Sequence, residues 1–194
     1  MPVPADRLTT APNLLSLSRL PLAAALFACI AYDAWPLALG VFAVAAVTDA
    51  LDGWLARRLG LVSAVGRALD PLTDKVLLGG AFVYLLRVPA AGLSEWMVAT
   101  LIGRELLVTG LRGMAEAVGV AFGADRWGKL KTAAQFAWVA TVLGRLSVGD
   151  ESAAGWWAQA GLLAAMLVLT VGSGLNYTAK AARALNAGVR SPTR

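Results

Sequence analysis

Long apolar stretches, separated by short breaks that contain proline, glycine or charged residues, divide the chain into six segments. Each segment is close to the roughly 20 residues that a helix needs to cross a bilayer. The predicted helices cover residues 13–32, 35–59, 64–86, 93–118, 127–146 and 153–185. Because they occupy nearly the whole chain, we expect a single all-α, membrane-embedded domain over residues 1–194, in which residues 1–11 form an interfacial segment.

The composition also favours a membrane protein. Hydrophobic residues make up 58% of the 194 residues and charged residues only 15%, whereas soluble domains have about 45–50% and about 25%. The sequence has no histidine and a single cysteine, Cys29, so histidine-based catalysis and an internal disulfide are excluded. We therefore expect a polytopic protein with six transmembrane helices, whose chemistry depends on carboxylates, lysine and arginine. A soluble helical core is the less favoured alternative.

Lysine and arginine are unevenly distributed between the two ends of the predicted helices. If the N-terminus lies inside, only Arg87 and Arg145 of these 17 residues fall on the outer side. Since cytoplasmic loops are enriched in lysine and arginine, we expect a multi-pass membrane protein with both termini in the cytoplasm. The surplus of 17 basic over 12 acidic residues fits anionic head groups and phosphorylated substrates rather than nucleic acid.

Four aspartates lie within one short stretch of this apolar chain. Asp49 and Asp52 are three residues apart, and Asp70 and Asp74 are four apart, so each pair lies on one helix face. If the two helices lie side by side, the four carboxylates meet where only a cation would hold them together. Hard oxygen ligands suit Mg²⁺ or Mn²⁺, and two such ions form a known clamp for displacement at phosphorus. The alternative is that these aspartates are helix caps and surface charges.

Small residues accompany the aspartates on the same helices. Gly53 and Ala56 follow Asp52, and Gly66 precedes Asp70. Small side chains let a ligand approach the backbone closely, although membrane helices also use them for tight packing against each other. Because they stand among carboxylates, we favour the approach of a ligand.

The spacing of all these residues resembles a known signature. Residues 49–74 read Asp-x2-Asp-Gly-x2-Ala-Arg-x8-Gly-x3-Asp-x3-Asp, as in the CDP-alcohol phosphatidyltransferase family. The resemblance implies a six-helix membrane fold, usually a homodimer, with an active site open to the cytoplasm. It implies that a second alcohol displaces CMP from a CDP-linked lipid or alcohol, that Asp49, Asp52 and Asp70 bind metal, and that Asp74, also close to metal, is the general base.

The same resemblance implies a site for the CDP moiety. Gly53, Ala56, Arg57 and Gly66 match positions that hold CDP, beside Asp49, Asp52 and Asp70. On the first helix, Asn13, Ser16 and Arg19 recur every three residues, and a similar opening lines the nucleotide site in the family. Asn13 could equally cap the helix, and Arg19 could extend its charge to the membrane surface.

Four further cations are candidates for binding the acceptor alcohol. Arg104, Arg112, Lys129 and Lys131 suit a phosphorylated, dianionic acceptor because arginine binds phosphate bidentately. Alternatively, Arg112, Lys129 and Lys131 only signal topology, and Arg104 pairs with Glu105 or Glu116. Residues 12–21, 102–112 and 128–135 resemble the family members in which CDP-diacylglycerol and sn-glycerol 3-phosphate give phosphatidylglycerophosphate and CMP.

Other activities remain as alternatives. Within the family, the acceptor could be inositol phosphate or phosphatidylglycerol. From another class, a helical chain with intramembrane acids could be a divalent-cation or proton-coupled transporter. Transporters often contain internal repeats, whereas this sequence has no second copy of the aspartate pattern.

Overall fold

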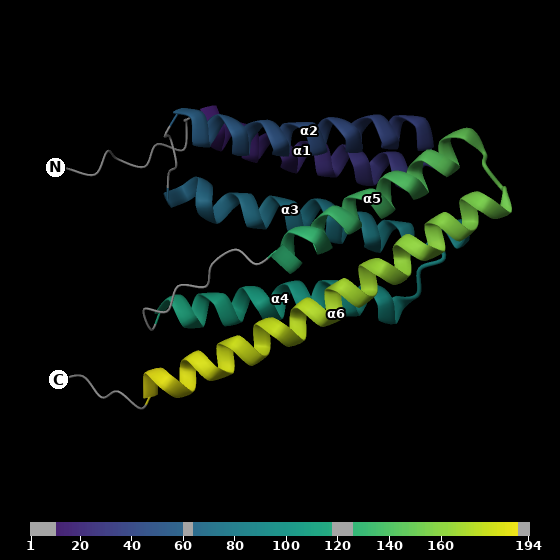
Figure 1. The fold of residues 1–194 in the computed structure, drawn as a ribbon. Helices are drawn as coiled ribbons and strands as arrows, with labels where there is room; N and C mark the ends of the chain where they lie inside the picture. The colour runs from purple at the N-terminus through teal and green to yellow at the C-terminus, as the bar shows by residue number, and fades with distance from the viewer. Residues whose placement is uncertain (1–10, 60–63, 118–125, 190–194) are drawn as a thin grey trace.

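The computed structural model describes the backbone of residues 11–59, 64–117 and 126–189, and the side chains of residues 17–49, 51, 73, 75–115 and 127–183. Six α-helices and one short 3₁₀ helix make up this part of the chain, which contains no strand (Figure 1). They are α1 (Ala11–Ala31), α2 (Trp35–Leu59), α3 (Ala64–Leu85), η1 (Pro89–Ala91), α4 (Glu95–Ala117), α5 (Arg126–Val148) and α6 (Ala153–Val189). The all-α prediction is confirmed, and every predicted helix has a counterpart whose ends lie within a few residues.

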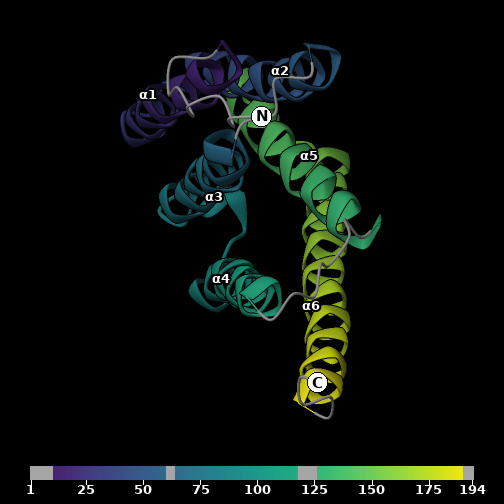
Figure 2. The ribbon, with the colours of Figure 1, turned by 90° about the vertical axis from the view of Figure 1, so that its left-hand side faces the viewer.

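The helices pack as two groups joined through α5 (Figure 2). Helix α1 packs against both α2 and α3, while α6 packs against α4 and α5, and α5 also contacts α2. Contact between α3 and α4 is limited. A cavity lies between these helices, lined chiefly by residues of α3, α4 and α5.

Hydrogen bonds join the helices at one end of the bundle. This end contains the α1–α2, α3–α4 and α5–α6 connections. Arg87, after α3, donates hydrogen bonds to the Ile30 carbonyl and to Asp33. Gln159 of α6 donates to the carbonyls of Ala90 and Ala91 in η1, both at 2.9 Å. These bonds hold the turns at this end in place. The opposite end of the bundle, where α2 connects to α3, has a different chemistry.

Most of the buried polar side chains lie in that opposite half of the molecule. The apolar core holds Leu26, Phe82 and Trp138, all nearly inaccessible to solvent. Toward the other end the buried residues become polar: Arg19, Thr73, Lys131, Gln135, Thr170 and Ser173. Because buried polar groups are stable only with partners, this half is where a polar site can be built.

Only α6 meets the length and apolarity expected of a membrane span within the described residues, over the 31 residues from Ala153 to Arg183. Among the described side chains, α1, α2 and α3 include shorter apolar stretches, Leu17–Ala31, Trp35–Asp49 and Lys75–Leu85. The predicted crossing of the membrane by all six helices therefore stays a prediction, as does the interfacial segment, most of which lies outside the described residues.

Candidate active site

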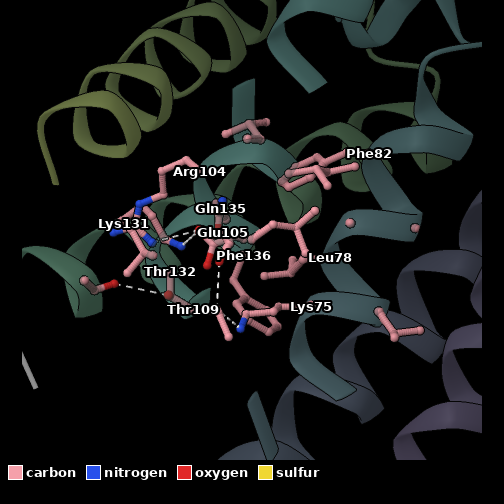
Figure 3. Close-up of a pocket in the computed structure, with 18 of the residues that line it drawn as sticks. Lys75, Leu78, Phe82, Arg104, Glu105, Thr109, Lys131, Thr132, Gln135 and Phe136 are labelled. Carbon is pink, nitrogen blue, oxygen red and sulfur yellow. Dashed lines mark hydrogen bonds and ion pairs between the residues drawn. The ribbon is translucent and has the colours of Figure 1, made fainter. Parts of the chain in front are cut away.

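A large cavity occupies the polar half of the molecule, between α3, α4, α5 and α6 (Figure 3). Its volume is about 1540 Å³, and Asp49 of α2 contributes to its lining. Ligand pockets in proteins are typically about 300–1,000 Å³, so this cavity has room for a large ligand or for two ligands together. One side is apolar, with Leu78, Phe82 and Phe136, and the other is rich in charged side chains.

Asp49, the first aspartate of the pattern, is held by a buried arginine. Arg19 of α1 donates a hydrogen bond from Nη1 to Oδ1 of Asp49 at 2.7 Å. The arginine side chain is fully buried, whereas the Asp49 side chain is 37% exposed. Arg19 thus has a partner across the helix interface, and the alternative in which it extends to the membrane surface is wrong.

The other three aspartates belong to the same end of the fold. Asp52 follows Asp49 by three residues on α2, and α3 carries Asp70 and Asp74. The side chains of these three aspartates lie outside the described residues. Only residues 60–63 separate α2 from α3, and a chain of that length spans at most about 18 Å. The short connection therefore keeps the acidic parts of α2 and α3 at the same end of the bundle.

Helix packing corrects one detail of the expected geometry. In the described part of the structure, α2 and α3 each pack chiefly against α1 rather than side by side along their length. No described group of three acidic or cysteine side chains could hold a metal ion, since Asp49 is the only member of the pattern whose side chain is described. By donor type, four carboxylates fit a hard divalent cation.

The residues that the sequence assigns to the CDP moiety share this end of the bundle. Asn13 and Ser16 lie on α1, about two turns and one turn before Arg19. Gly53, Ala56 and Arg57 lie on α2, and Gly66 lies on α3. Their helices are described but their side chains are not, so their contacts stay predictions.

Three of the predicted acceptor-binding residues meet around one acid and one tyrosine. Glu105 Oε1 accepts a hydrogen bond from Arg104 Nη1 at 3.0 Å and also pairs with Lys131 of α5 (Figure 3). Arg104 Nη2 donates to Ser173 Oγ of α6 at 2.9 Å. The suggested pairing of Arg104 with Glu105 is confirmed, and the arginine still lines the cavity.

Arg112 lies about two turns after Arg104 on α4 and lines the same wall of the cavity. Its Nη2 donates to Tyr177 Oη at 3.2 Å. The guanidinium carbons of Arg112 and Arg104 lie 5.7 Å and 5.8 Å from the centre of the Tyr177 ring, within range of a cation–π interaction. Tyr177 is buried, so it fixes the position of both arginines from α6.

Lys129 and Lys75 complete the charged lining. Lys129, the fourth predicted acceptor-binding residue, is exposed at the mouth of the cavity. Lys75 of α3, one residue after Asp74, donates a hydrogen bond to Thr109 Oγ1 of α4. Lys75 therefore links the helix that carries two aspartates to the helix that carries the arginines.

Sequence reasoning missed the contribution of α6. Thr170, Ser173 and Tyr177 follow one another at helical spacing on one face of an otherwise apolar helix, and all three are buried. A polar stripe in a long apolar helix is a signal of an interior polar surface. The sequence contained that signal, but it did not show that Ser173 and Tyr177 would contact arginines of α4.

The fold and the cavity define an all-helical protein with a cation-lined site beside an acidic helix pair. The chain belongs to the CDP-alcohol phosphatidyltransferase family, whose model matches residues 9–172. Family membership and the apolar α6 together identify a membrane protein.

Three relatives illustrate the similarity. The chain is 42% identical over 103 residues to CDP-diacylglycerol–glycerol-3-phosphate 3-phosphatidyltransferase of Bacillus subtilis, a match that spans 53% of the chain but only about half, 52%, of that relative. It is 38% identical to the protein of the same name from Escherichia coli, over 73% of the chain and 76% of the relative. It is 33% identical to a probable phosphatidylglycerophosphate synthase of Mycobacterium tuberculosis, over 95% and 87%.

Proposed function

We propose that this protein transfers a phosphatidyl group from CDP-diacylglycerol to sn-glycerol 3-phosphate, giving phosphatidylglycerophosphate and CMP for phosphatidylglycerol and cardiolipin synthesis. The observation that carries the proposal is the cavity, in which the nearly inaccessible Arg104 of α4 and Lys131 of α5 share one space with Asp49, the first aspartate of the family pattern. The names of the similar proteins support the same pair of substrates.

The acidic end of α2 and α3 would hold Mg²⁺ or Mn²⁺, in our proposal two ions, through Asp49, Asp52, Asp70 and Asp74. Bound metal would neutralise the diphosphate and lower the barrier to displacement at phosphorus. Arg19 contributes by fixing the carboxylate of Asp49. Arg57 would bind the phosphate of the departing CMP, with Asn13, Ser16, Gly53, Ala56 and Gly66 around the rest of the nucleotide.

Asp74 would act as the general base. It would accept the proton of the primary hydroxyl of glycerol 3-phosphate, whose oxygen forms a bond to the lipid-linked phosphorus while the bond to CMP breaks. Metal lowers the pKa of a nearby carboxylate and weakens it as a base, but metal also stabilises the developing alkoxide. The two effects partly offset each other.

Arg104, Arg112, Lys129 and Lys131 would bind the phosphate of the acceptor. Arg104 and Lys131 have side chains only 9% and 4% exposed, and a charge in such surroundings interacts strongly with a substrate charge. The apolar side of the cavity, with Leu78, Phe82 and Phe136, would face the lipid substrate.

For the setting of the enzyme, we propose six spans in the bacterial inner membrane, with both termini and the cavity mouth on the cytoplasmic side, and a homodimer. The exposed apolar side chains on several helices, such as Val44, Leu107 and Val168, support contact with lipid or with a second copy.

An assay of the purified protein with radiolabelled CDP-diacylglycerol tests the proposal. Glycerol 3-phosphate, inositol phosphate and phosphatidylglycerol are each offered as acceptor, and CMP release is measured with and without EDTA. We expect release only with glycerol 3-phosphate, its loss with EDTA, and its recovery with excess Mg²⁺. Turnover with another acceptor instead would identify that acceptor as the substrate. The absence of CMP release with every acceptor would favour a transporter.

A further inference from the structure

We propose that Glu105 is a specificity-determining residue that sets the net charge of the acceptor pocket to match a phosphate dianion. The inference rests on the proposed function, because it concerns the acceptor site of that reaction. It assigns the acid a role that differs from those of the cations around it.

The geometry of Glu105 carries the proposal. Its Oε1 is shared between two cations from different helices, Arg104 of α4 and Lys131 of α5. Both cations are nearly inaccessible, whereas Glu105 is 22% exposed and lines the cavity. A shared acid of this kind fixes two cations at once and cancels one of their charges.

Part of the hydrogen-bonding capacity of the arginines is left unused by this arrangement. Arg104 Nε and Arg112 Nε are buried and have no hydrogen-bond partner among the described residues. Buried donors without partners are rare in folded proteins because they cost free energy. Arg145 Nε, at the opposite end of the bundle, is also buried without a hydrogen-bond partner among the described residues, so these donors do not by themselves select a ligand and the proposal rests on the ion pairs of Glu105.

The charges of the pocket then match one chemical class of ligand. Arg104, Arg112 and Lys131 contribute three positive charges and Glu105 one negative charge, which leaves two. A phosphate monoester carries a charge of about −1.5 to −2 at pH 7. The lining also contains Lys75 and Asp49, whose charges offset each other, and Lys129. Lys129 is exposed, so solvent screens its charge more strongly.

A series of three variants changes this net charge in single steps. Lys131→Gln lowers it by one, Glu105→Gln raises it by one, and the double variant restores the wild-type value while removing the ion pair. The probe is inorganic phosphate, measured as a competitive inhibitor against glycerol 3-phosphate and, without turnover, by the shift it causes in the thermal unfolding temperature of the purified protein.

We expect Lys131→Gln to weaken phosphate binding at least about tenfold and Glu105→Gln to strengthen it about threefold or more. The double variant should lie within about threefold of the wild type. The proposal is overturned if the double variant binds phosphate as weakly as Lys131→Gln, or if Glu105→Gln leaves phosphate binding unchanged or weaker.

Two features keep this test decisive. The comparison of the double variant with Lys131→Gln suffices even if Glu105→Gln alone does not fold. Because the thermal shift needs no turnover, the charge series can succeed in a protein that does not use glycerol 3-phosphate, so failure of the proposed function and failure of this inference give different results.

Discussion

Arg19 and Asp49 form a hydrogen-bonded ion pair of 2.7 Å that joins α1 to α2 at the edge of the cavity. The arginine is completely buried and the aspartate is about one-third exposed. The last residue of the polar series Asn13, Ser16 and Arg19 on α1 thus orients the first carboxylate of the acidic pattern. The pair connects the packing of the bundle to the proposed metal site.

Replacing Arg19 with methionine should reduce activity at least about tenfold and raise the Mg²⁺ concentration needed for half-maximal rate. Loss of a charged hydrogen bond also removes about 1.5–3 kcal/mol of stability. CMP release over a Mg²⁺ titration, together with thermal unfolding in detergent, measures both effects.

Arg87→Gln is the matched control for Arg19. Arg87 also pairs with an aspartate, Asp33, but at the opposite end of the bundle and with its side chain 43% exposed. The control should lower stability slightly and leave the Mg²⁺ dependence unchanged. An equal change in Mg²⁺ dependence in both variants would contradict the role given to Arg19.

Asp74→Asn should remove nearly all turnover while the protein stays folded. A general base contributes about 10²–10⁴-fold to the rate, and asparagine keeps the size of the side chain but cannot accept the proton. CMP release and thermal unfolding are measured beside Asp33→Asn, whose position at the other end of the bundle predicts a near-normal rate. A near-normal rate for Asp74→Asn would refute the assignment of the base.

Tyr177→Phe should raise the KM for glycerol 3-phosphate about two- to tenfold with a smaller change in kcat, because it removes one hydrogen bond of about 0.5–1.5 kcal/mol to Arg112. Tyr177→Leu should have a larger effect, since it also removes the ring next to both arginines. Tyr84→Phe serves as control, because Tyr84 stacks on Phe27 away from the charged lining. If the two Tyr177 variants left KM at the wild-type value, the positioning role would be wrong.

Gly80→Ala should destabilise the protein by about 1–3 kcal/mol through overpacking of α1 against α3. A Cβ atom at Gly80 would overlap the ring of Phe27, and this ring is stacked on Tyr84 with centroids 5.1 Å apart, so it has no simple way to move. Gly40→Ala is the control, because nothing lies within 4 Å of the corresponding Cβ position. Equal unfolding temperatures for the two variants would show that the ring moves freely.

Much of the fold follows from local sequence. The predicted segments 35–59 and 64–86 correspond to α2 (Trp35–Leu59) and α3 (Ala64–Leu85), because apolar stretches and the breaks between them act within one segment. The polar residues of the α4–α5 region pointed to a charged pocket, and the cavity contains Arg104, Arg112, Lys129 and Lys131.

The partners of those residues could not be predicted in the same way. Arg104 meets Ser173 and Arg112 meets Tyr177 across 69 and 65 residues of sequence, and these contacts depend on how α4 and α6 are rotated toward each other. Glu105 was a possible partner of Arg104 from its position in the chain, but its second partner, Lys131, lies 26 residues away. No periodicity within a single helix contains that information.

The sequence by itself determined the helices, the spacing of the four aspartates and the family, since each depends on residues that are close together in the chain or on a fixed motif. Only the tertiary structure decided that α1 packs against both α2 and α3, that Arg19 holds Asp49, and that Glu105 lies between two cations. The physical reason is that ion pairs between helices form only after packing has set the distance and rotation of each helix relative to its neighbours.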